Sequence, residues 1–273
     1  MQHLDLESVA QELRRDAIRM IYDGGDGHPG PALSVADIVT ALYFRVLRID
    51  ASRPDWPERD RLVLSKGHAC PIVYAALAKL GYLDKQENLV LRALGSALQG
   101  HPDMNKTPGI DMTSGSLGNG ISLGLGMALG GRYNGLDYTT YVITGDGELE
   151  EGIIWEAAMC AARYRVGSLI VIVDHNGLQS GDAISEISGL EPILPKWKAF
   201  GWHCQEIDGH DFSQILSAVD RAKEQTGMPS VIMANTTKGK GVPFMENNND
   251  WHKGVPSDAQ YKEAMLALGG GVS

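Results

Sequence analysis

Two polar residues that could bind a metal ion closely follow predicted strands. Asp146 comes after the β-branched run 140–144, and Asn176 ends the apolar run 168–176, thirty residues later, with one predicted helix between them. Because the carboxyl ends of neighbouring parallel strands meet at one edge of a sheet, we expect these side chains to lie side by side. A carboxylate, an amide oxygen and a nearby carbonyl such as that of Leu178 suit Mg²⁺, which takes few protein ligands and leaves the rest to water and phosphates. The pattern therefore predicts a Mg²⁺ site for a diphosphate ligand.

Three histidines next to glycine could move protons near neutral pH. They are His28 in GHPG, His68 in KGHA and His101 in GHPD. Imidazole is the side chain whose ordinary pKa lies closest to neutrality, which suits general acid–base chemistry. Each one alone is more often a solvated loop residue. Their occurrence together with the predicted metal site favours a chemical role, whereas His203 and His210 are expected at the surface or at a strand edge.

The elements that position these residues alternate along the chain. Near-continuous apolar strands separated by helices are typical of a parallel sheet that is covered on both faces. The predicted fold class is therefore α/β, with a mostly parallel sheet and helices on both faces. Ser34 is expected to cap the helix that follows it, with Asp37 at the third position. The predicted strands are 140–144, 168–176, 202–208 and 229–235, and the predicted helices are 5–22, 35–47, 71–80, 84–94, 151–164, 211–226 and 257–268.

The composition fits one large domain spanning 1–273, with an irregular tail from about residue 238. The chain has 273 residues, 43% of them hydrophobic, and a net charge of −10. No apolar run reaches the about 20 residues of a membrane span, and the N-terminus lacks a signal-peptide pattern, so we expect a cytoplasmic protein. The acidic balance without a basic run argues against nucleic acid as a partner. The three cysteines are too few for a disulfide framework.

The segment GDGELEEG…VDHN resembles the metal–diphosphate motif of thiamine diphosphate enzymes, and its surroundings resemble transketolase. Further segments that resemble transketolase follow in family order at 26–38, 61–83, 100–128 and 236–252, so that the resemblance covers about 10–255. It implies a thiamine diphosphate-binding fold, with thiamine diphosphate and Mg²⁺ as cofactors. The implied activity is transfer of a two-carbon ketol unit from a sugar-type donor to an aldehyde acceptor.

The resemblance also implies roles for individual residues. It assigns Mg²⁺ to Asp146, Asn176 and the carbonyl of Leu178, and close backbone approach of the diphosphate to Gly145 and Gly147. The implied cofactor contacts are His68 and the turn Gly115, Ser116 and Leu117, and the implied channel to the reactive carbon is lined by His28, His101 and His252. Acids close to the cofactor and to the subunit contact match Glu151 and Glu156, and the loop that closes over the diphosphate contains Lys238. The sequence departs from the family at Ser116, where proline is usual, and at Lys253, where glycine often follows the histidine.

A full-length transketolase-like chain would continue into a domain that carries the glutamate activating the aminopyrimidine ring of the cofactor. No second parallel-sheet pattern follows residue 255, so we expect a split enzyme. Its partner would be a separate C-terminal subunit that carries the pyrimidine-binding domain, in a heterotetramer of two copies of each chain. The resemblance places the arginines that hold sugar phosphate on that partner. The glycine run 115–130 is either a helix packed tightly in the core or, as we favour, the face where two chains meet.

Two other functions stay open at this point. The first is another thiamine diphosphate enzyme, a carboligase or a decarboxylating enzyme acting on a 2-oxo acid, although the histidine spacing favours transketolase. The second is a non-catalytic nucleotide-binding module of Rossmann type. The segment GLGMALGG departs from the GxGxxG fingerprint and precedes a strand instead of following one, which argues against that module.

Overall fold

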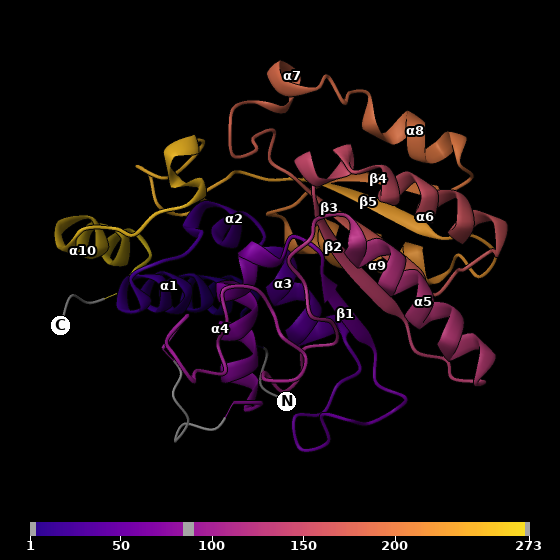
Figure 1. The fold of residues 1–273 in the computed structure, drawn as a ribbon, viewed down its shortest axis with the longest axis horizontal. Helices are drawn as coiled ribbons and strands as arrows, with labels where there is room; N and C mark the ends of the chain where they lie inside the picture. Colours follow the sequence, from indigo (N-terminus) through magenta and orange to yellow (C-terminus); the bar gives the residue numbers. More distant parts are fainter. Residues whose placement is uncertain (1–3, 84–89, 271–273) are drawn as a thin grey trace.

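The computed structural model describes residues 4–83 and 90–270, and its centre is a sheet of five parallel strands (Figure 1). The strands follow the order β1-β2-β3-β5-β4. Their bounds are Arg61–Leu64 for β1, Thr140–Gly145 for β2, Leu169–His175 for β3, His203–Asp208 for β4 and Ser230–Asn235 for β5. The four predicted strands and the parallel arrangement are confirmed. The short edge strand β1 was not predicted from the sequence.

Alternate residues of the central strands pack into two separate hydrophobic layers. Ile170 and Ile172 of β3 belong to one layer, whereas Val171 and Val173 belong to the other. The first layer contains α1 (Leu6–Gly24), α3 (Ala36–Ala41), α4 (Cys70–Leu80) and α9 (Phe212–Lys223). The second contains α5 (Asn119–Tyr133), α6 (Gly152–Arg163) and α8 (Ile193–Ala199). The expected α/β fold with helices on both faces is therefore confirmed.

The segment around 35–47 differs from the predicted single helix. Ser34 is the last residue of α2 (Pro29–Ser34), and α3 continues into the π-helical turn η1 (Leu42–Val46). The hydroxyl of Ser34 donates to Asp174 Oδ2 at 2.6 Å, and no side chain caps α3, so the predicted capping box is wrong. Asp37 instead forms a buried ion pair with Arg14 at 2.7 Å. A partner distant in sequence outweighs the local capping interaction at both residues.

The predicted helix 84–94 lies partly outside the described residues, and 90–94 form turns instead of a helix. The other predicted helices correspond to α1, α4, α6, α9 and α10 (Asp258–Ala267). The structure also contains α7 (Ile184–Ile187) and the 3₁₀ turns η2 (Gly67–Ala69), η3 (Gly147–Glu150) and η4 (Asn249–His252). None of the described helices is long and apolar enough to cross a membrane. The three cysteines are free.

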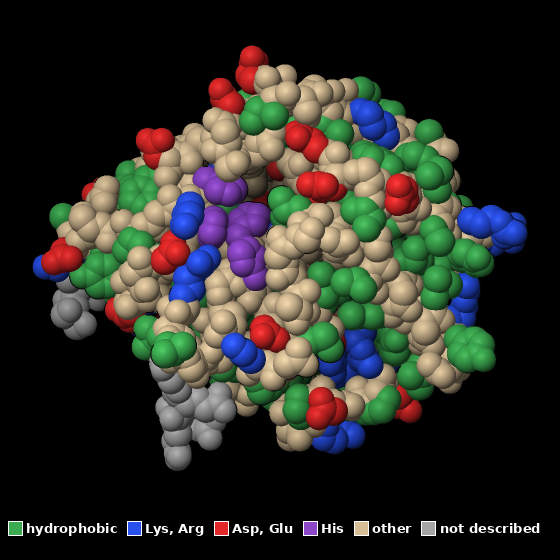
Figure 2. All heavy atoms as spheres, in the orientation of Figure 1, with side chains coloured by type: hydrophobic (Ala, Val, Ile, Leu, Met, Phe, Trp, Pro, Cys, Tyr) green, Lys and Arg blue, Asp and Glu red, His purple; other side chains and the backbone are tan. Residues whose placement is uncertain are grey.

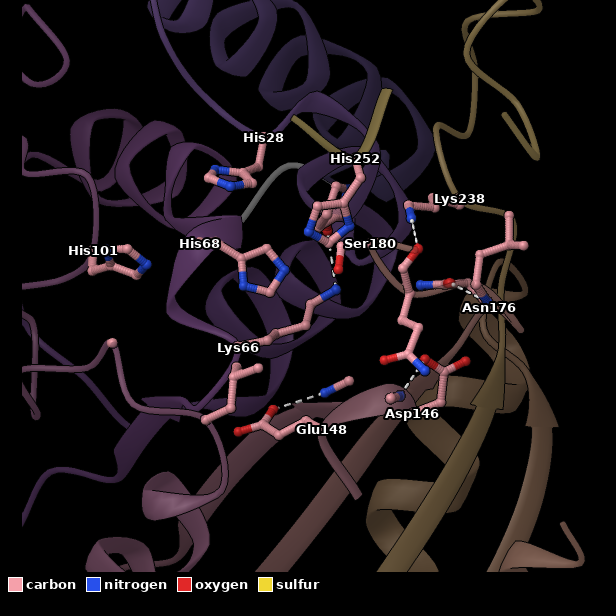
Figure 3. A pocket seen from close by; sticks show the side chains of 17 residues that line it. His28, Lys66, His68, His101, Asp146, Glu148, Asn176, Ser180, Lys238 and His252 are labelled. Atoms are coloured by element: carbon pink, nitrogen blue, oxygen red, sulfur yellow. Dashed lines mark hydrogen bonds between the residues drawn. The ribbon is translucent and has the colours of Figure 1, made fainter. Parts of the chain in front are cut away.

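The tail from residue 238 forms turns up to Asn248, and η4 and α10 follow. It nevertheless packs onto the first layer, because Val242, Met245 and Leu268 form a small core with Ile18 and Leu33. This packing fixes the path of the tail along α1 and α2. It also returns the chain to the carboxyl edge of the sheet, where Figure 3 shows the tail beside the pocket described below.

Candidate active site

A cavity of about 260 Å³ opens where the carboxyl ends of β1, β2, β3 and β5 meet (Figure 3). Each of these strands is followed by residues of the cavity wall, and the rest come from loops far away in sequence. Most of the residues that the sequence singled out gather at this edge of the sheet. The lining residues are His28, Pro31, Lys66, His68, His101, Gly115, Leu117, Gly145, Asp146, Gly147, Glu148, Asn176, Leu178, Gln179, Ser180, Lys238 and His252.

Asp146 is a buried carboxylate at the end of β2, with only 2% of its surface exposed. Its Oδ1 accepts from the amide of Gly147 at 2.8 Å, and its Oδ2 accepts from the amide of Gly177 at 2.6 Å. Burial and the neighbouring Asp174 raise the pKa of Asp146 to about 6. Within the described chain no Lys, Arg or His forms an ion pair with it. A buried acid with amide donors but no cationic partner is suited to a bound cation.

Asn176 lies next to Asp146, as the sequence predicts, because Gly177 bonds to the Asp146 carboxylate. The Nδ2 group of Asn176 donates to Asp174 Oδ2 at 3.2 Å, and its Oδ1 accepts from the amide of Leu178 at 3.1 Å. Among the described residues no three His, Cys, Asp or Glu side chains cluster to hold a metal. A metal here would therefore rely on one carboxylate plus amide and carbonyl oxygens, which fits Mg²⁺ with phosphate and water ligands.

Asp174 and Lys66 form a buried ion pair beneath this site. Asp174 is fully buried, and it also accepts from the hydroxyls of Ser34 and Thr236. Burial alone would raise the pKa of Asp174, but the Lys66 charge and these hydrogen bonds outweigh it and lower the pKa. The pair connects the ends of β1, β3 and β5 and holds the amide of Asn176. Sequence analysis missed it, although an acid within an apolar strand was a usable signal.

Glu148 is a second residue that the sequence analysis missed. Its Oε1 accepts from the Ser65 hydroxyl and from the amide of Gly118 at 2.7 Å, and its Oε2 accepts from the amide of Gly145 at 3.0 Å. Burial raises the pKa of this carboxyl. Gly118 has a φ of 82°, and a Cβ there would lie 2.7 Å from Cβ of Glu151, so only glycine fits. Glu148 thus fixes the start of α5 against the ends of β1 and β2.

Three of the predicted histidines pack ring against ring. The ring centroids of His28 and His68 are 5.2 Å apart, those of His28 and His252 are 5.6 Å apart, and those of His68 and His252 are 5.2 Å apart. Burial and nearby cations lower the pKa of His28 to about 4 and that of His252 to about 3, and hold the pKa of His68 well below its ordinary value. The Nδ1 atoms of His28 and His252 have no hydrogen-bond partner among the described residues. The cluster offers neutral imidazoles to a ligand.

His101 lies in the same cavity, and burial followed by the charge of Arg92 lowers its pKa. In Figure 3 the histidines lie on one side of the cavity, whereas Asp146 and Asn176 lie on the opposite side. The cavity is therefore divided into a side with oxygen ligands and a side with imidazoles.

Lys238 lies in the cavity wall and is fully buried. Its Nζ donates to Asn249 Oδ1 at 2.6 Å and to the carbonyl of Gln179 at 3.2 Å. Burial, followed by the charge of Lys66, lowers the pKa of Lys238 to about 8. A buried ammonium group whose hydrogen-bond partners are uncharged is suited to a phosphate ligand. Gln179 and Ser180, which line the cavity beside it, were not predicted.

Three predicted site residues lie outside the cavity wall. Ser116 is exposed in the turn before α5, Glu151 is exposed immediately before α6, and Glu156 is exposed on α6. Their side chains lie on surfaces that the described residues leave uncovered. Their predicted roles near the cofactor and the subunit contact therefore depend on a second chain.

The glycine run packs against the sheet at some positions and is open at others. A Cβ at Gly120 would clash with Ser65, and one at Gly124 would lie 2.5 Å from Val142, so these two glycines permit close packing on the sheet. At Gly126 and Gly130 an added Cβ would have no neighbouring atom within 4 Å. The core interpretation is confirmed for the first pair, and the second pair lies on the outer side of α5.

The parallel sheet and its histidine-lined cavity, with an acid and an amide at adjacent strand ends, define the class: a diphosphate-binding domain of a thiamine diphosphate enzyme. The family described as "Transketolase, thiamine diphosphate binding domain" matches residues 6–270. The chain therefore belongs to the transketolase family. The Rossmann-type module that the sequence left open is not supported.

Relatives of similar length are described as transketolase subunits. The chain is 47% identical to the 6-deoxy-6-sulfo-D-fructose transketolase subunit of Clostridium sp. strain MSTE9, over 98% of this chain and 97% of that one. It is 38% identical to an apulose-4-phosphate transketolase subunit of Phocaeicola vulgatus, over 97% of this chain and 94% of that one. The chain is 39% identical to human transketolase over 96% of its own length, and the match covers only 41% of the human protein.

Solved structures give the same result. Transketolase from Pichia stipitis in complex with sedoheptulose 7-phosphate matches with a TM-score of 0.91 and 32% identity, over 97% of this chain and 41% of that one. Transketolase from Campylobacter jejuni matches with a TM-score of 0.91 and 30% identity, over 99% of this chain and 43% of that one. The chain thus has the fold of about two fifths of a full-length transketolase.

Proposed function

We propose that this chain is the diphosphate-binding subunit of a two-subunit transketolase, which transfers a two-carbon ketol unit from a sugar-type donor to an aldehyde acceptor. The observation that carries the proposal is the pairing of buried Asp146 with Asn176 across a cavity from the histidine cluster. The relatives described as transketolase subunits, which match over nearly their whole length, support the division into subunits.

The donor set fits Mg²⁺ and thiamine diphosphate. Asp146, Asn176 and the carbonyl of Leu178 would hold the metal, and the backbone at Gly145 and Gly147 would lie against the diphosphate. Lys238, which lies on the same side of the cavity as Asn176 (Figure 3), would neutralise diphosphate oxygens. When bound, thiamine diphosphate supplies the carbanion-stabilising chemistry of ketol transfer.

The histidines would bind and deprotonate the sugar. Neutral imidazoles can accept a proton from a substrate hydroxyl and return it. The unpartnered Nδ1 atoms of His28 and His252 in the described chain are available for such hydrogen bonds, and His68 and His101 complete the same wall. Lys253 follows His252 on the exposed surface and forms an ion pair with Asp26, so it does not fill the place of the imidazole.

The partner would be a separate C-terminal subunit that carries the pyrimidine-binding domain, in a heterotetramer of two copies of each chain. The outer side of α5 and α6 supports a subunit contact, because Leu123 is 48% exposed and Met159 is 51% exposed there. Glu156 is exposed on the same helix as Met159. We also propose that the assembly works in the cytoplasm, as expected from the sequence.

The substrates are proposed to be anionic sugars. The two relatives of similar length are named for 6-deoxy-6-sulfo-D-fructose and for apulose 4-phosphate, and each of these sugars carries a strongly acidic group. We expect a sugar phosphate or sugar sulfonate to be the natural donor or acceptor of the assembled enzyme.

Reconstitution tests the proposal. The chain and its partner are purified separately and mixed with Mg²⁺ and thiamine diphosphate, and ketol transfer is followed by aldehyde formation from a ketose donor. We expect transfer only with both chains and both cofactors, and its loss in Asp146→Asn but not in Asp137→Asn, a surface control with 82% side-chain exposure. Full activity of Asp146→Asn would contradict the proposal, and turnover of pyruvate instead of ketoses would favour the 2-oxo acid alternative.

A further inference from the structure

Two cations are held together at the surface by one acid. Arg92 Nη1 lies 3.1 Å from Asp26 Oδ2, and Lys253 Nζ lies 3.6 Å from Asp26 Oδ1. The three residues come from separate parts of the chain: the connection between α1 and α2, the segment before His101, and the residue after η4. With two positive charges and one negative charge, the cluster keeps one net positive charge.

The cluster lies at the imidazole side of the cavity. After burial, the positive charges of Arg92 and Lys253 contribute to the lowered pKa of His28, and Arg92 also acts on His101. A Cβ at Gly100 would lie 2.5 Å from Cζ of Arg92, so the guanidinium rests directly on the residue before His101. Figure 2 shows the histidines gathered in one hollow of this face, with basic side chains and an acidic one beside them. The two cations therefore lie close to His28 and His101, on the imidazole side of the cavity and outside its lining residues.

Both cations keep donors for a second anion. Arg92 has 27% of its side chain exposed, with its Nη1 on Asp26 and its Nη2 3.5 Å from the carbonyl oxygen of Gly100. Each of these two nitrogens carries a second N–H group, whereas the Nε is buried. Lys253 has 58% of its side chain exposed, and 3.6 Å from Asp26 is an ion-pair distance without a normal hydrogen bond. Asp26 thus restricts both side chains without using all of their N–H groups.

We propose that Arg92 and Lys253 form a subsite for the terminal phosphate or sulfonate group of the sugar substrate, with Asp26 holding the two cations in position. The proposal rests on the proposed function, since it places the reacting end of the sugar among the histidines and its charged end at these two cations. A guanidinium can bind a tetrahedral oxyanion through two parallel hydrogen bonds, and an ammonium adds a point charge. This chain would then share anion recognition with its partner subunit.

The test compares anionic and neutral substrates on the assembled enzyme. We measure kcat/KM for a ketose phosphate, a ketose sulfonate and the uncharged ketose of the same length, with wild type, Arg92→Gln and Lys253→Gln. Each substitution is expected to lower the ratio of anionic to neutral kcat/KM by roughly tenfold, the size of one charge-assisted hydrogen bond, through a higher KM for the anionic sugar. Lys253→Arg should keep the ratio. Lys79→Gln, which removes an ion-paired lysine elsewhere, controls for net charge and should also keep it.

The outcomes separate the subsite from the proposed function. A fall of the ratio with both anionic ketoses supports a general oxyanion subsite, and a fall with only one of them assigns the subsite to that anion. Ratios within twofold of wild type in both Gln variants would overturn the subsite, even if the variants were less active overall. A wild-type assembly that transfers no ketol unit from any of the three ketoses would refute the proposed function, and the subsite with it.

Discussion

Replacing Asp146 with asparagine distinguishes two effects of its buried charge: the free energy that the charge costs the folded chain, and the binding of a cation. The carboxylate accepts two backbone hydrogen bonds but has no ion-pair partner in the described chain, and burial together with Asp174 raises its pKa from 3.8 to about 6. In the cofactor-free chain this group therefore opposes folding at neutral pH. In the loaded enzyme the same charge would hold the metal. Asp146→Asn should therefore stabilise the cofactor-free chain at neutral pH but weaken the binding of metal and cofactor in the loaded enzyme.

The sign of the pH effect follows from the raised pKa. Below pH 3.8 the carboxyl is protonated in both the folded and the unfolded chain and contributes nothing. As the pH rises toward 6 the unfolded chain loses its proton first, so the carboxyl destabilises the fold, by about 3 kcal/mol once the folded state has also ionised. Asparagine does not titrate. The unfolding free energy of Asp146→Asn, relative to wild type, should therefore rise by about 1–2 kcal/mol between about pH 5 and about pH 7.5.

Urea unfolding of the cofactor-free chain at these two pH values measures this change, and the difference between variant and wild type cancels the titration of all other groups. The NH₂ group of asparagine cannot accept one of the two backbone hydrogen bonds that Asp146 accepts. This loss changes the unfolding free energy equally at both pH values, so it does not affect the pH trend. In the assembled enzyme, Mg²⁺ with thiamine diphosphate should raise the Tm of wild type but not that of the variant. A pH-independent difference, or an equal rise of Tm in both proteins, would refute the reasoning.

Three further predictions concern the support of the site. Lys66→Met leaves the buried carboxylate of Asp174 unpaired and should lower the unfolding free energy by about 3–5 kcal/mol. Lys79→Met, which removes a surface ion pair, should lower it by less than about 1 kcal/mol. Equal losses in urea unfolding would contradict the buried pairing. Gly120→Ala should destabilise the chain by about 1–3 kcal/mol, because the added methyl group would clash with Ser65. Gly126→Ala, on the open side of α5, should instead stabilise the chain by about 0.5–1 kcal/mol and weaken assembly with the partner. Unaltered assembly in sedimentation analysis would argue against that face as an interface. The imidazole of His28, with its pKa lowered to about 4, should stay neutral at pH 5.5 in an NMR titration. Because the unfolded chain takes up this proton first, the folded state loses stability as the pH falls from 6.5 toward 4. A titration midpoint near 6.5 would disprove the lowered pKa.

The sequence predicted the parallel sheet and the meeting of Asp146 with Asn176 because both depend on local patterns. Strands β2 and β3 are nearly continuous apolar runs, and consecutive parallel strands place their ends together. The short strand β1 has only four residues, which is too few for a period to be recognised.

The residues that support the site could not be predicted in the same way. Asp174 bonds to Ser34, which is 140 positions away in sequence, and Glu148 bonds to Ser65, which is 83 positions away. Such partners are known only once the chain is folded. The same reason explains the wrong capping prediction at Ser34. It also explains why the contact of half-buried His210, whose Nδ1 lies 2.7 Å from Asp37 Oδ2, was not foreseen. Local patterns thus located the edge of the sheet where the cavity opens, and buried pairs distant in sequence determine its detailed geometry.

A crystal structure of the chain assembled with its partner subunit, Mg²⁺ and thiamine diphosphate tests the central claim most directly. The account predicts a metal ion about 2.0–2.1 Å from a carboxylate oxygen of Asp146, the amide oxygen of Asn176 and the carbonyl of Leu178, with diphosphate oxygens completing its octahedron. Metal and diphosphate bound elsewhere, with Asp146 and Asn176 contacting neither of them, would contradict it.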